Sequence, residues 1–316
     1  MSLFDAYLMV DWSARDQRCG GRQDCIWIAY GSGSAVAPQT VSPASRTEAE
    51  HLVCAQLHAH VTIKKERVLL GADFGYGYPA GFASLLVNSM AEDLPPWRIV
   101  WQYLNGHVRD DLGTKPGGKP SNRNNRFEVA SAINVLASTP KSPGPFWCLA
   151  KSGSYTCIPQ RRPAQPFACS HASIPSLRIT DERVGSDTPF RLFGTGSVGG
   201  QVLTGIPRLH NIRFAPEFAD SSAVWPFETG WGSMTGSWPD ANVRIVHAEI
   251  YPSVRTPLAD TIKDRGQVRA MWHWARDLDA KDLLVNEFSI PPGVAEGSCE
   301  DVVIRSEEGW ILGCRS

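Results

Sequence analysis

Acidic residues stand at the ends of three short apolar runs that read as β-strands, over residues 7–11, 68–73 and 243–250, and these acids are Asp11, Asp73 and Glu249. In an open α/β sheet the ligand crevice lies outside the carboxyl ends of the strands, so we expect the three carboxylates to lie close together. Like charges at short range are costly unless a cation lies between them. Oxygen ligands without clustered Cys or His favour Mg²⁺ or Mn²⁺ over zinc. The alternative is that each acid only begins a turn.

The elements that must position these acids are visible as periodic patterns. Residues 25–30 form another apolar run bounded by glycines, typical of a strand. Residues 47–63 begin with Thr47 as an N-cap and repeat apolar residues at helical spacing. Residues 267–278 predict a second helix and residues 310–314 a last short strand. This order of strands and helices predicts an α/β fold on a mixed sheet.

The middle of the chain has a different composition. Of 23 prolines 17, and of 28 glycines 16, fall between residues 79 and 240, so regular elements are expected to be scarce there. We therefore predict one α/β core made of residues 1–78 and 241–316, with an irregular basic insertion at 79–240. From Arg109 to Arg213 the net charge is +8, which leaves −9 for the rest of the chain. Its basic stretch 115–126, which ends at Arg126, is either a phosphate-tracking segment or a solvated loop.

Length and composition narrow the class of protein. A chain of 316 residues with 42% hydrophobic and 20% charged residues is typical of a folded globular protein. No apolar run approaches the roughly 20 residues of a membrane span, and the first residues do not read as a secretory signal. The eight cysteines contain no CxxC pair, so we interpret them as reduced thiols of a cytoplasmic protein.

Four short segments follow one another along the chain: Val10-Asp-Trp-Ser-Ala14, Gly71-Ala-Asp-Phe-Gly-Tyr-Gly-Tyr-Pro79, Ala248-Glu-Ile-Tyr-Pro-Ser253 and Glu308-Gly-Trp-Ile311. A fifth, Arg178-Ile-Thr-Asp-Glu-Arg183, lies inside the insertion. It is the order of these segments, rather than any one of them, that resembles a family of uncharacterised predicted nucleases to which the ribonuclease-H-like fold is assigned.

The resemblance implies a ribonuclease-H-like mixed five-stranded sheet flanked by helices, with strand-end acids and a helix acid that hold two metal ions. Carried onto this sequence, the catalytic and metal-binding residues are Asp11, Asp73, Glu249 and Asp264. Gln267 stands where the family favours another acid in the last helix, and this departure predicts weaker binding of one metal. For Arg178, Glu182 and Arg183 the resemblance implies substrate contact, whereas the alternative is a surface ion pair of little energetic value.

A glycine-rich stretch at residues 194–199 spells the dinucleotide fingerprint GxGxxG. The fingerprint works only after a buried strand and within a βαβ unit, and neither is predicted here. We therefore predict no NAD binding. Instead, a loop whose backbone donors face an anion is expected, with Gly196, Ser197 and Gly199 as substrate-binding residues.

The function expected from these observations is metal-dependent phosphodiester hydrolysis by clustered strand-end carboxylates, as in a nuclease. The expected partner is nucleic acid or another phosphate-containing substrate, without a membrane. Two alternatives stay open at this point. One is a non-catalytic module that binds a nucleotide or nucleic acid, and the other is an actin-like ATP phosphohydrolase, in which Asp11 and Asp73 would serve equally. The oligomeric state does not follow from the sequence.

Overall fold

A mixed β-sheet of six strands forms the centre of the protein. The computed structural model describes residues 2–87, 93–139, 143–150, 155–169, 173–233 and 238–314. The strand order is β3-β2-β1-β4-β8-β7. β1, β4, β8 and β7 run parallel, while β2 is antiparallel to both β1 and β3. The strands are β1 (Ala6–Asp11), β2 (Trp27–Ser32), β3 (Gln39–Val41), β4 (Val68–Ala72), β7 (Ser222–Val224) and β8 (Ile245–Glu249).

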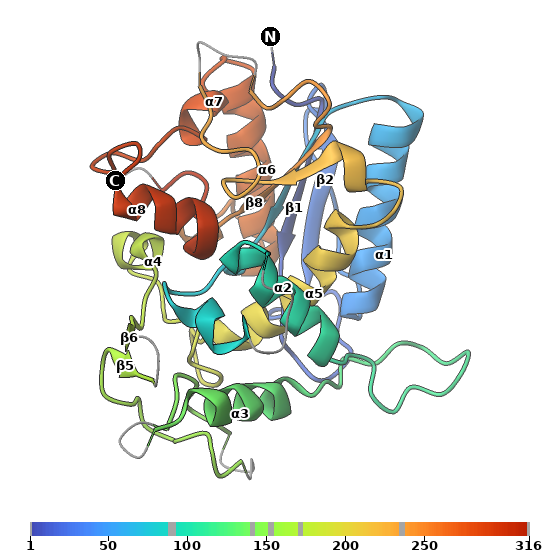
Figure 1. Ribbon diagram of the computed structural model, residues 1–316. Helices are drawn as coiled ribbons and strands as arrows, with labels where there is room; N and C mark the ends of the chain where they lie inside the picture. The colour runs from blue at the N-terminus through green and yellow to red at the C-terminus, as the bar shows by residue number, and fades with distance from the viewer. Residues whose placement is uncertain are drawn as a thin grey trace.

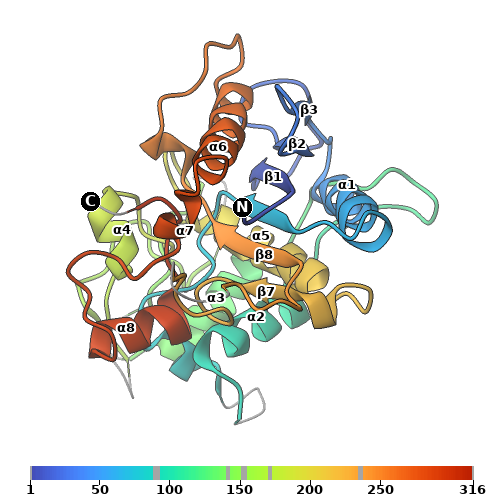
Figure 2. The same ribbon diagram turned by 90° about the horizontal axis from the view of Figure 1, so that it is seen from above.

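Helices cover both faces of this sheet. Figure 2 shows α6 on one side of β1 and β2, with α1, α5 and α2 on the other side. In Figure 1, α3 and the two-stranded ribbon β5–β6 lie beyond the end of the sheet at which β1 finishes. The helices are α1 (Arg46–Leu57), α2 (Pro96–His107), α3 (Arg126–Ala137), α4 (Ile179–Val184), α5 (Gly199–Arg213), α6 (Lys263–Asp279), α7 (Leu284–Glu287) and α8 (Cys299–Val303), and the ribbon is β5 (Phe167–Ala168) with β6 (Ser173–Ile174).

Each sheet face has its own hydrophobic core because successive side chains of a strand point to opposite faces. On β1, Leu8 and Val10 join the core beneath α1 and α5. Tyr7 and Met9 join the core beneath α6. At the far end of α6, the carboxylate of Asp279 accepts hydrogen bonds from the Tyr7 hydroxyl and from the backbone at the start of the chain. The long helix therefore spans the sheet from its carboxyl edge to its amino edge.

The predicted α/β fold on a mixed sheet is confirmed. The predicted number of five strands is wrong, because the sheet has six. The sixth comes from the middle of the chain, where Ser222–Val224 pairs with β8. The expected strand at 310–314 is reduced to a single bridge between Ile311 and Glu249. The scarcity of regular elements in 79–240 is also wrong, since α2, α3, α4 and α5 lie there. The boundaries of the two-part core stay a prediction.

Two smaller expectations need correction. The first helix is capped by Ser45 rather than Thr47, and its continuation at His58–Ile63 is π-helical. Cys19 and Cys25 are not free thiols but form a disulfide. The connection between β1 and β2 folds back on itself and brings their Cα atoms to 5.7 Å, a separation that a disulfide spans. Among the described residues, no helix combines the length and the apolar character that crossing a membrane requires.

Gly77 tests the packing of the segment after β4. A Cβ atom on this residue would collide with the carbonyl oxygens of Glu307 and Glu308. We expect Gly77→Ala to lower the free energy of unfolding by about 1–3 kcal/mol, as overpacking against rigid backbone does. Gly106 in α2 is the matched control, because a Cβ there meets nothing within 4 Å. Gly106→Ala should raise stability by up to about 1 kcal/mol through helix propensity, and denaturant unfolding measures both changes.

Candidate active site

Two of the predicted acids lie side by side at the carboxyl edge of the sheet. Asp11 is the last residue of β1, and Asp73 directly follows β4. The two strands pair in parallel with Val10 opposite Ala72, and the Asp73 N–H donates to the Val10 carbonyl at 2.9 Å. Strand alternation turns both carboxylates toward the face that α6 covers, the face of Met9. The register of one strand pair therefore forces the two acids together.

Asp264 approaches the same place from α6. It stands in the first turn of that helix and is mostly buried. Its two carboxylate oxygens accept hydrogen bonds from Gln23 Nε2 at 2.7 Å and from the Asp24 N–H at 2.6 Å. Gln23 and Asp24 belong to the connection between β1 and β2. This connection therefore fixes the Asp264 side chain over the end of β1.

The electrostatics of the three acids show how close they are. Burial raises the pKa of Asp11 well above its ordinary value, and the charges of Asp73 and Asp264 raise it further, against a lowering effect of Lys263. Burial, followed by the charges of Glu249 and Asp264, raises the pKa of Asp73 to about 7. Burial also raises the pKa of Asp264, although its two hydrogen bonds oppose the shift. Each carboxylate is thus disfavoured as an anion by burial, and charged neighbours add to this effect on Asp11 and Asp73.

The carboxylates of Asp11 and Asp73 have no compensating partner. Neither accepts a hydrogen bond nor forms an ion pair with any residue that the structure describes. Asp11 is 8% exposed and Asp73 is partly exposed, and no oxygen of either is fully buried without a partner, so the two like charges face solvent rather than protein donors. A cation is the ligand that such a pair lacks.

Glu249 is placed differently from the other predicted acids. It lies level with Ala72 in the pairing of β8 with β4, so its side chain points to the opposite face from Asp73. There it accepts hydrogen bonds from Arg178 Nη1 at 2.7 Å, from Arg178 Nη2 at 2.6 Å and from the Tyr76 N–H at 3.0 Å. Both of its oxygens are therefore engaged by the protein, and its bond to Tyr76 holds the segment that begins at Asp73.

Arg178 is a buried structural cation. Its guanidinium also forms a double hydrogen bond with Asp181, at 2.9 and 2.7 Å, and donates to the Glu308 carbonyl. The side chains of Arg178, Asp181 and Glu249 are each less than 5% exposed. Of its sequence neighbours, Glu182 is exposed, and Arg183 donates to the Pro292 carbonyl and lies over the Trp310 ring.

The remaining predicted substrate residues lie around the start of α5 and α3. Arg126 is buried and pairs with Asp16 and Asn124. Gly196 and Ser197 belong to the turn before α5, where Gly196 has a φ of 79°. Gly199 is the first residue of α5, and its N–H donates to the Arg191 carbonyl. None of these residues contacts Asp11 or Asp73 directly in the part of the chain that the structure describes.

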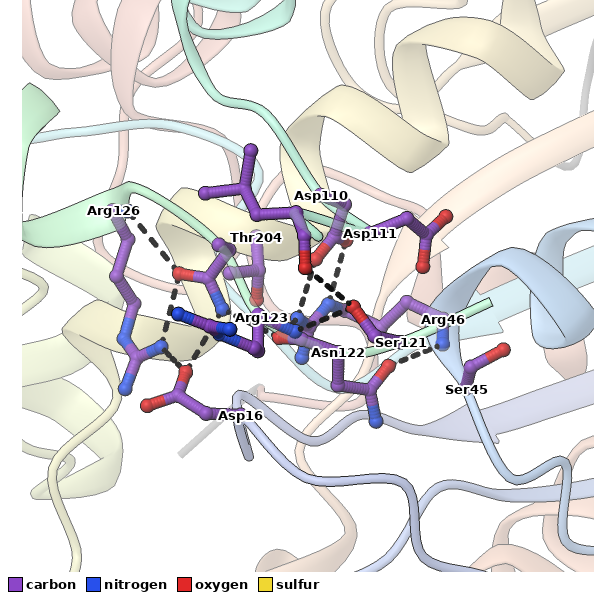
Figure 3. A network of polar contacts seen from close by, with 12 residues as sticks. Asp16, Ser45, Arg46, Asp110, Asp111, Ser121, Asn122, Arg123, Arg126 and Thr204 are labelled. Atoms are coloured by element: carbon purple, nitrogen blue, oxygen red, sulfur yellow. Dashed lines mark hydrogen bonds and ion pairs between the residues drawn. The ribbon is translucent and has the colours of Figure 1, made fainter. Parts of the chain in front are cut away.

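Sequence reasoning missed one polar network that supports the site (Figure 3). Arg46 is fully buried and donates to Asp110 at 2.8 and 2.5 Å and to the Asn122 carbonyl. It also donates to the carbonyls of Ser13 and Arg15, close after Asp11. One feature of the sequence could have indicated this network. Arg46 directly follows the N-cap Ser45, where a cation is disfavoured by the helix dipole and therefore needs acidic partners.

The donor set suits a hard divalent cation only in part. Within the described ranges, no group of three or more His, Cys, Asp or Glu residues is arranged as a ready-made metal site. The free carboxylates of Asp11 and Asp73 fit Mg²⁺ or Mn²⁺, and Asp264 is fixed nearby. Gln267, which lies one turn further along α6, contacts Ser253 Oγ at 3.4 Å.

Comparisons with protein-family models, curated proteins and solved structures found no match to this chain. The geometry of the acids therefore carries the functional argument.

Asp73→Asn tests the repulsion between the acids. An aspartate in an unfolded chain ionises near pH 4, whereas the folded pKa is about 7, so the folded protein binds more protons between these values. Without metal, the free energy of unfolding of wild type should therefore fall as pH rises through this window. The variant should match wild type near pH 4 and exceed it at pH 8 by on the order of 1 kcal/mol or more. Thermal melts in EDTA check this, and a variant less stable at both pH values would contradict it.

Arg178→Met tests the buried ion network. The change leaves Glu249 and Asp181 buried without their cation, so we expect a loss of about 3–5 kcal/mol in the free energy of unfolding. Arg15→Met is the control, because Arg15 makes only an exposed pair with Asp24 and should change stability by less than about 1 kcal/mol. Denaturant unfolding measures both, and equal effects would contradict a structural role for Arg178.

Proposed function

We propose that this protein is a metal-dependent phosphodiester hydrolase with a ribonuclease-H-like core, and that nucleic acid is its substrate. The observation that carries the proposal is the convergence of Asp11, Asp73 and Asp264, of which the first two have no partner among the described residues. A mixed sheet with acids at the ends of parallel strands and at the start of a helix also agrees with the resemblance in the sequence.

Each acid has a distinct role in this proposal. Asp11 and Asp73 would hold Mg²⁺ or Mn²⁺, and Asp264 completes the donor set in an orientation fixed by Gln23 and the Asp24 N–H. When bound, the metal supplies Lewis-acid stabilisation of the charge that develops on the phosphoryl oxygens. We assign Glu249 to positioning rather than to metal binding, because both of its oxygens are already engaged.

Exposed cations of the middle segment support nucleic acid as the substrate. Lys115, Lys119, Arg161 and Arg162 are exposed, and none of them forms an ion pair with a described residue. Free cations on irregular loops are suited to neutralising a phosphate backbone. The compartment that we propose from the sequence pattern is the cytoplasm, and the Cys19–Cys25 disulfide, which would be open to reduction there, argues against it.

A cleavage assay with Mg²⁺ or Mn²⁺ on labelled DNA and RNA tests the function. Wild type should cleave only with the metal, and Asp11→Asn or Asp73→Asn should lower the rate by about 100-fold or more, the scale of losing one electrostatic stabiliser. In thermal melts Glu249→Gln should be stabilised by Mg²⁺ as much as wild type is expected to be, because its side chain points to the opposite face from Asp73. Equal metal shifts in wild type and Asp73→Asn would end the proposal. Binding without turnover would favour a non-catalytic module, and ATP turnover alone would favour an actin-like enzyme.

Gln23→Ala tests the support of Asp264 without removing an acid. Loss of the Gln23 amide frees one Asp264 oxygen, and we expect activity or metal affinity to fall by about tenfold, as for other residues that orient ligands. Gln17→Ala is the matched control from the same connection, because its side chain is exposed. The comparison is made at several metal concentrations. A decrease in both variants would show a general effect of the connection rather than one on Asp264.

A further inference from the structure

The turn before α5 ends in backbone donors that have no acceptor. Gly194 and Gly196 have φ values of 104° and 79°, conformations that favour glycine, and the Ser197 N–H closes the turn on the Gly194 carbonyl. The N–H of Gly199 is used by Arg191, but those of Gly200 and Gln201 have no acceptor among the described residues. The first turn of this helix of 15 residues therefore has two backbone donors that an anion could use.

A buried arginine is directed at the same turn. The side chain of Arg126 is 9% exposed, and its Nη1 is used by Asp16 and Asn124. Its Nε is buried without a partner, and a Cβ atom on Gly200 would lie 3.5 Å from it. A buried guanidinium N–H without an acceptor is costly. The Nε atoms of Arg67, Arg98 and Arg255 are also without a partner, and what distinguishes Arg126 is its place beside the first turn of α5.

A second arginine flanks the turn from its other end. Arg191 Nε is also buried without a partner, and a Cβ atom on Gly194 would lie 2.8 Å from Arg191 Nη2. Its Nη1 pairs with Asp187 at 2.7 Å. Asp16 pairs with Nη1 of Arg126, and Asp187 pairs with Nη1 of Arg191. In both arginines the Nε atom is left without an acceptor.

The start of α5 packs against the residues that directly follow the two acids, on the face of the sheet opposite to their carboxylates. Gln201 Nε2 donates to the Trp12 carbonyl at 2.7 Å, and Trp12 directly follows Asp11. One turn further along α5, Gly205 packs against the ring of Phe74, which directly follows Asp73. The start of α5 therefore contacts both segments that leave the carboxyl edge of the sheet.

We propose that the first turn of α5, together with Arg126 and Arg191, binds a phosphate group. One part of this inference rests on the proposed function. If the substrate is a polynucleotide, the phosphate bound at α5 is a neighbour of the phosphate that is cleaved at Asp11 and Asp73. The oxyanion is held by the backbone N–H groups of Gly200 and Gln201 and by the two free Nε donors.

Titration with inorganic phosphate in EDTA tests the site, with chloride at matched ionic strength as the reference and ³¹P NMR or calorimetry as the measurement. We expect saturable binding to wild type that is weakened about tenfold in Arg126→Lys and in Arg191→Gln. Arg126→Lys keeps a cation for Asp16 but lacks the Nε donor. Arg244→Gln is the control, because this exposed arginine stands at the opposite edge of the sheet and should not change the affinity. Thermal melts establish that each variant is folded, and Arg191→Gln serves if Arg126→Lys is not.

The outcomes separate this site from the proposed function. Phosphate binding without metal that persists in Asp73→Asn supports the site whether or not the protein is a nuclease. Binding that requires Mg²⁺ and disappears in Asp73→Asn would overturn the site, because the phosphate would then lie at the carboxylates. Absence of binding, or equal affinity in both arginine variants and wild type, would also overturn it. A short oligonucleotide should displace the phosphate, and failure to do so would overturn the assignment to a polynucleotide.

Discussion

The parallel pairing of β1 with β4 is the constraint on which the rest of the candidate site depends. With Val10 opposite Ala72, the next residue on each strand is an acid, and alternation turns both acids to the same face. Packing of the preceding residues fixes this register, because a slip by one residue would move the apolar side chains from one core into the other, where the neighbouring side chains differ. The fold therefore holds two unpaired carboxylates together against their mutual repulsion, a local cost that is typical of a functional site.

The same register explains why Glu249 has another role. In β8 the residue level with Ala72 is Glu249 itself, so the acid lies one position short of Asp73 and faces the opposite side. A charge buried on that side needs a cation of the protein's own, and Arg178 supplies it from a segment 71 residues away in the sequence. Because Glu249 also accepts the Tyr76 N–H, the ion network determines the path of the chain just after Asp73. Glu249 thus contributes to the site by positioning the segment that begins at Asp73.

Sequence reasoning found the strands that carry the acids because each is a continuous apolar run, and it found Asp264 through the resemblance. It missed β7, since the three residues Ser222–Val224 are too short to show a period. It expected Arg126 and Arg178 to contact substrate or to lie at the surface, because residue type alone does not reveal burial. The bond between Cys19 and Cys25 depends on how the chain folds back after β1, which no spacing rule predicts.

The charge asymmetry of the chain has a structural cause as well as a functional one. Arg126, Arg178 and Arg208 of the basic middle segment pair with Asp16, Glu249 and Glu50 of the acidic outer segments. These three arginine side chains are at most 13% exposed, and their ion pairs attach the middle segment to the sheet. The Arg178–Glu249 pair is closed to water and weakly screened, whereas Asp16 is 51% exposed and its pair with Arg126 is screened more strongly. A net charge of +8 therefore overstates what the segment offers to a polyanion, because ion pairs with the outer segments neutralise part of it.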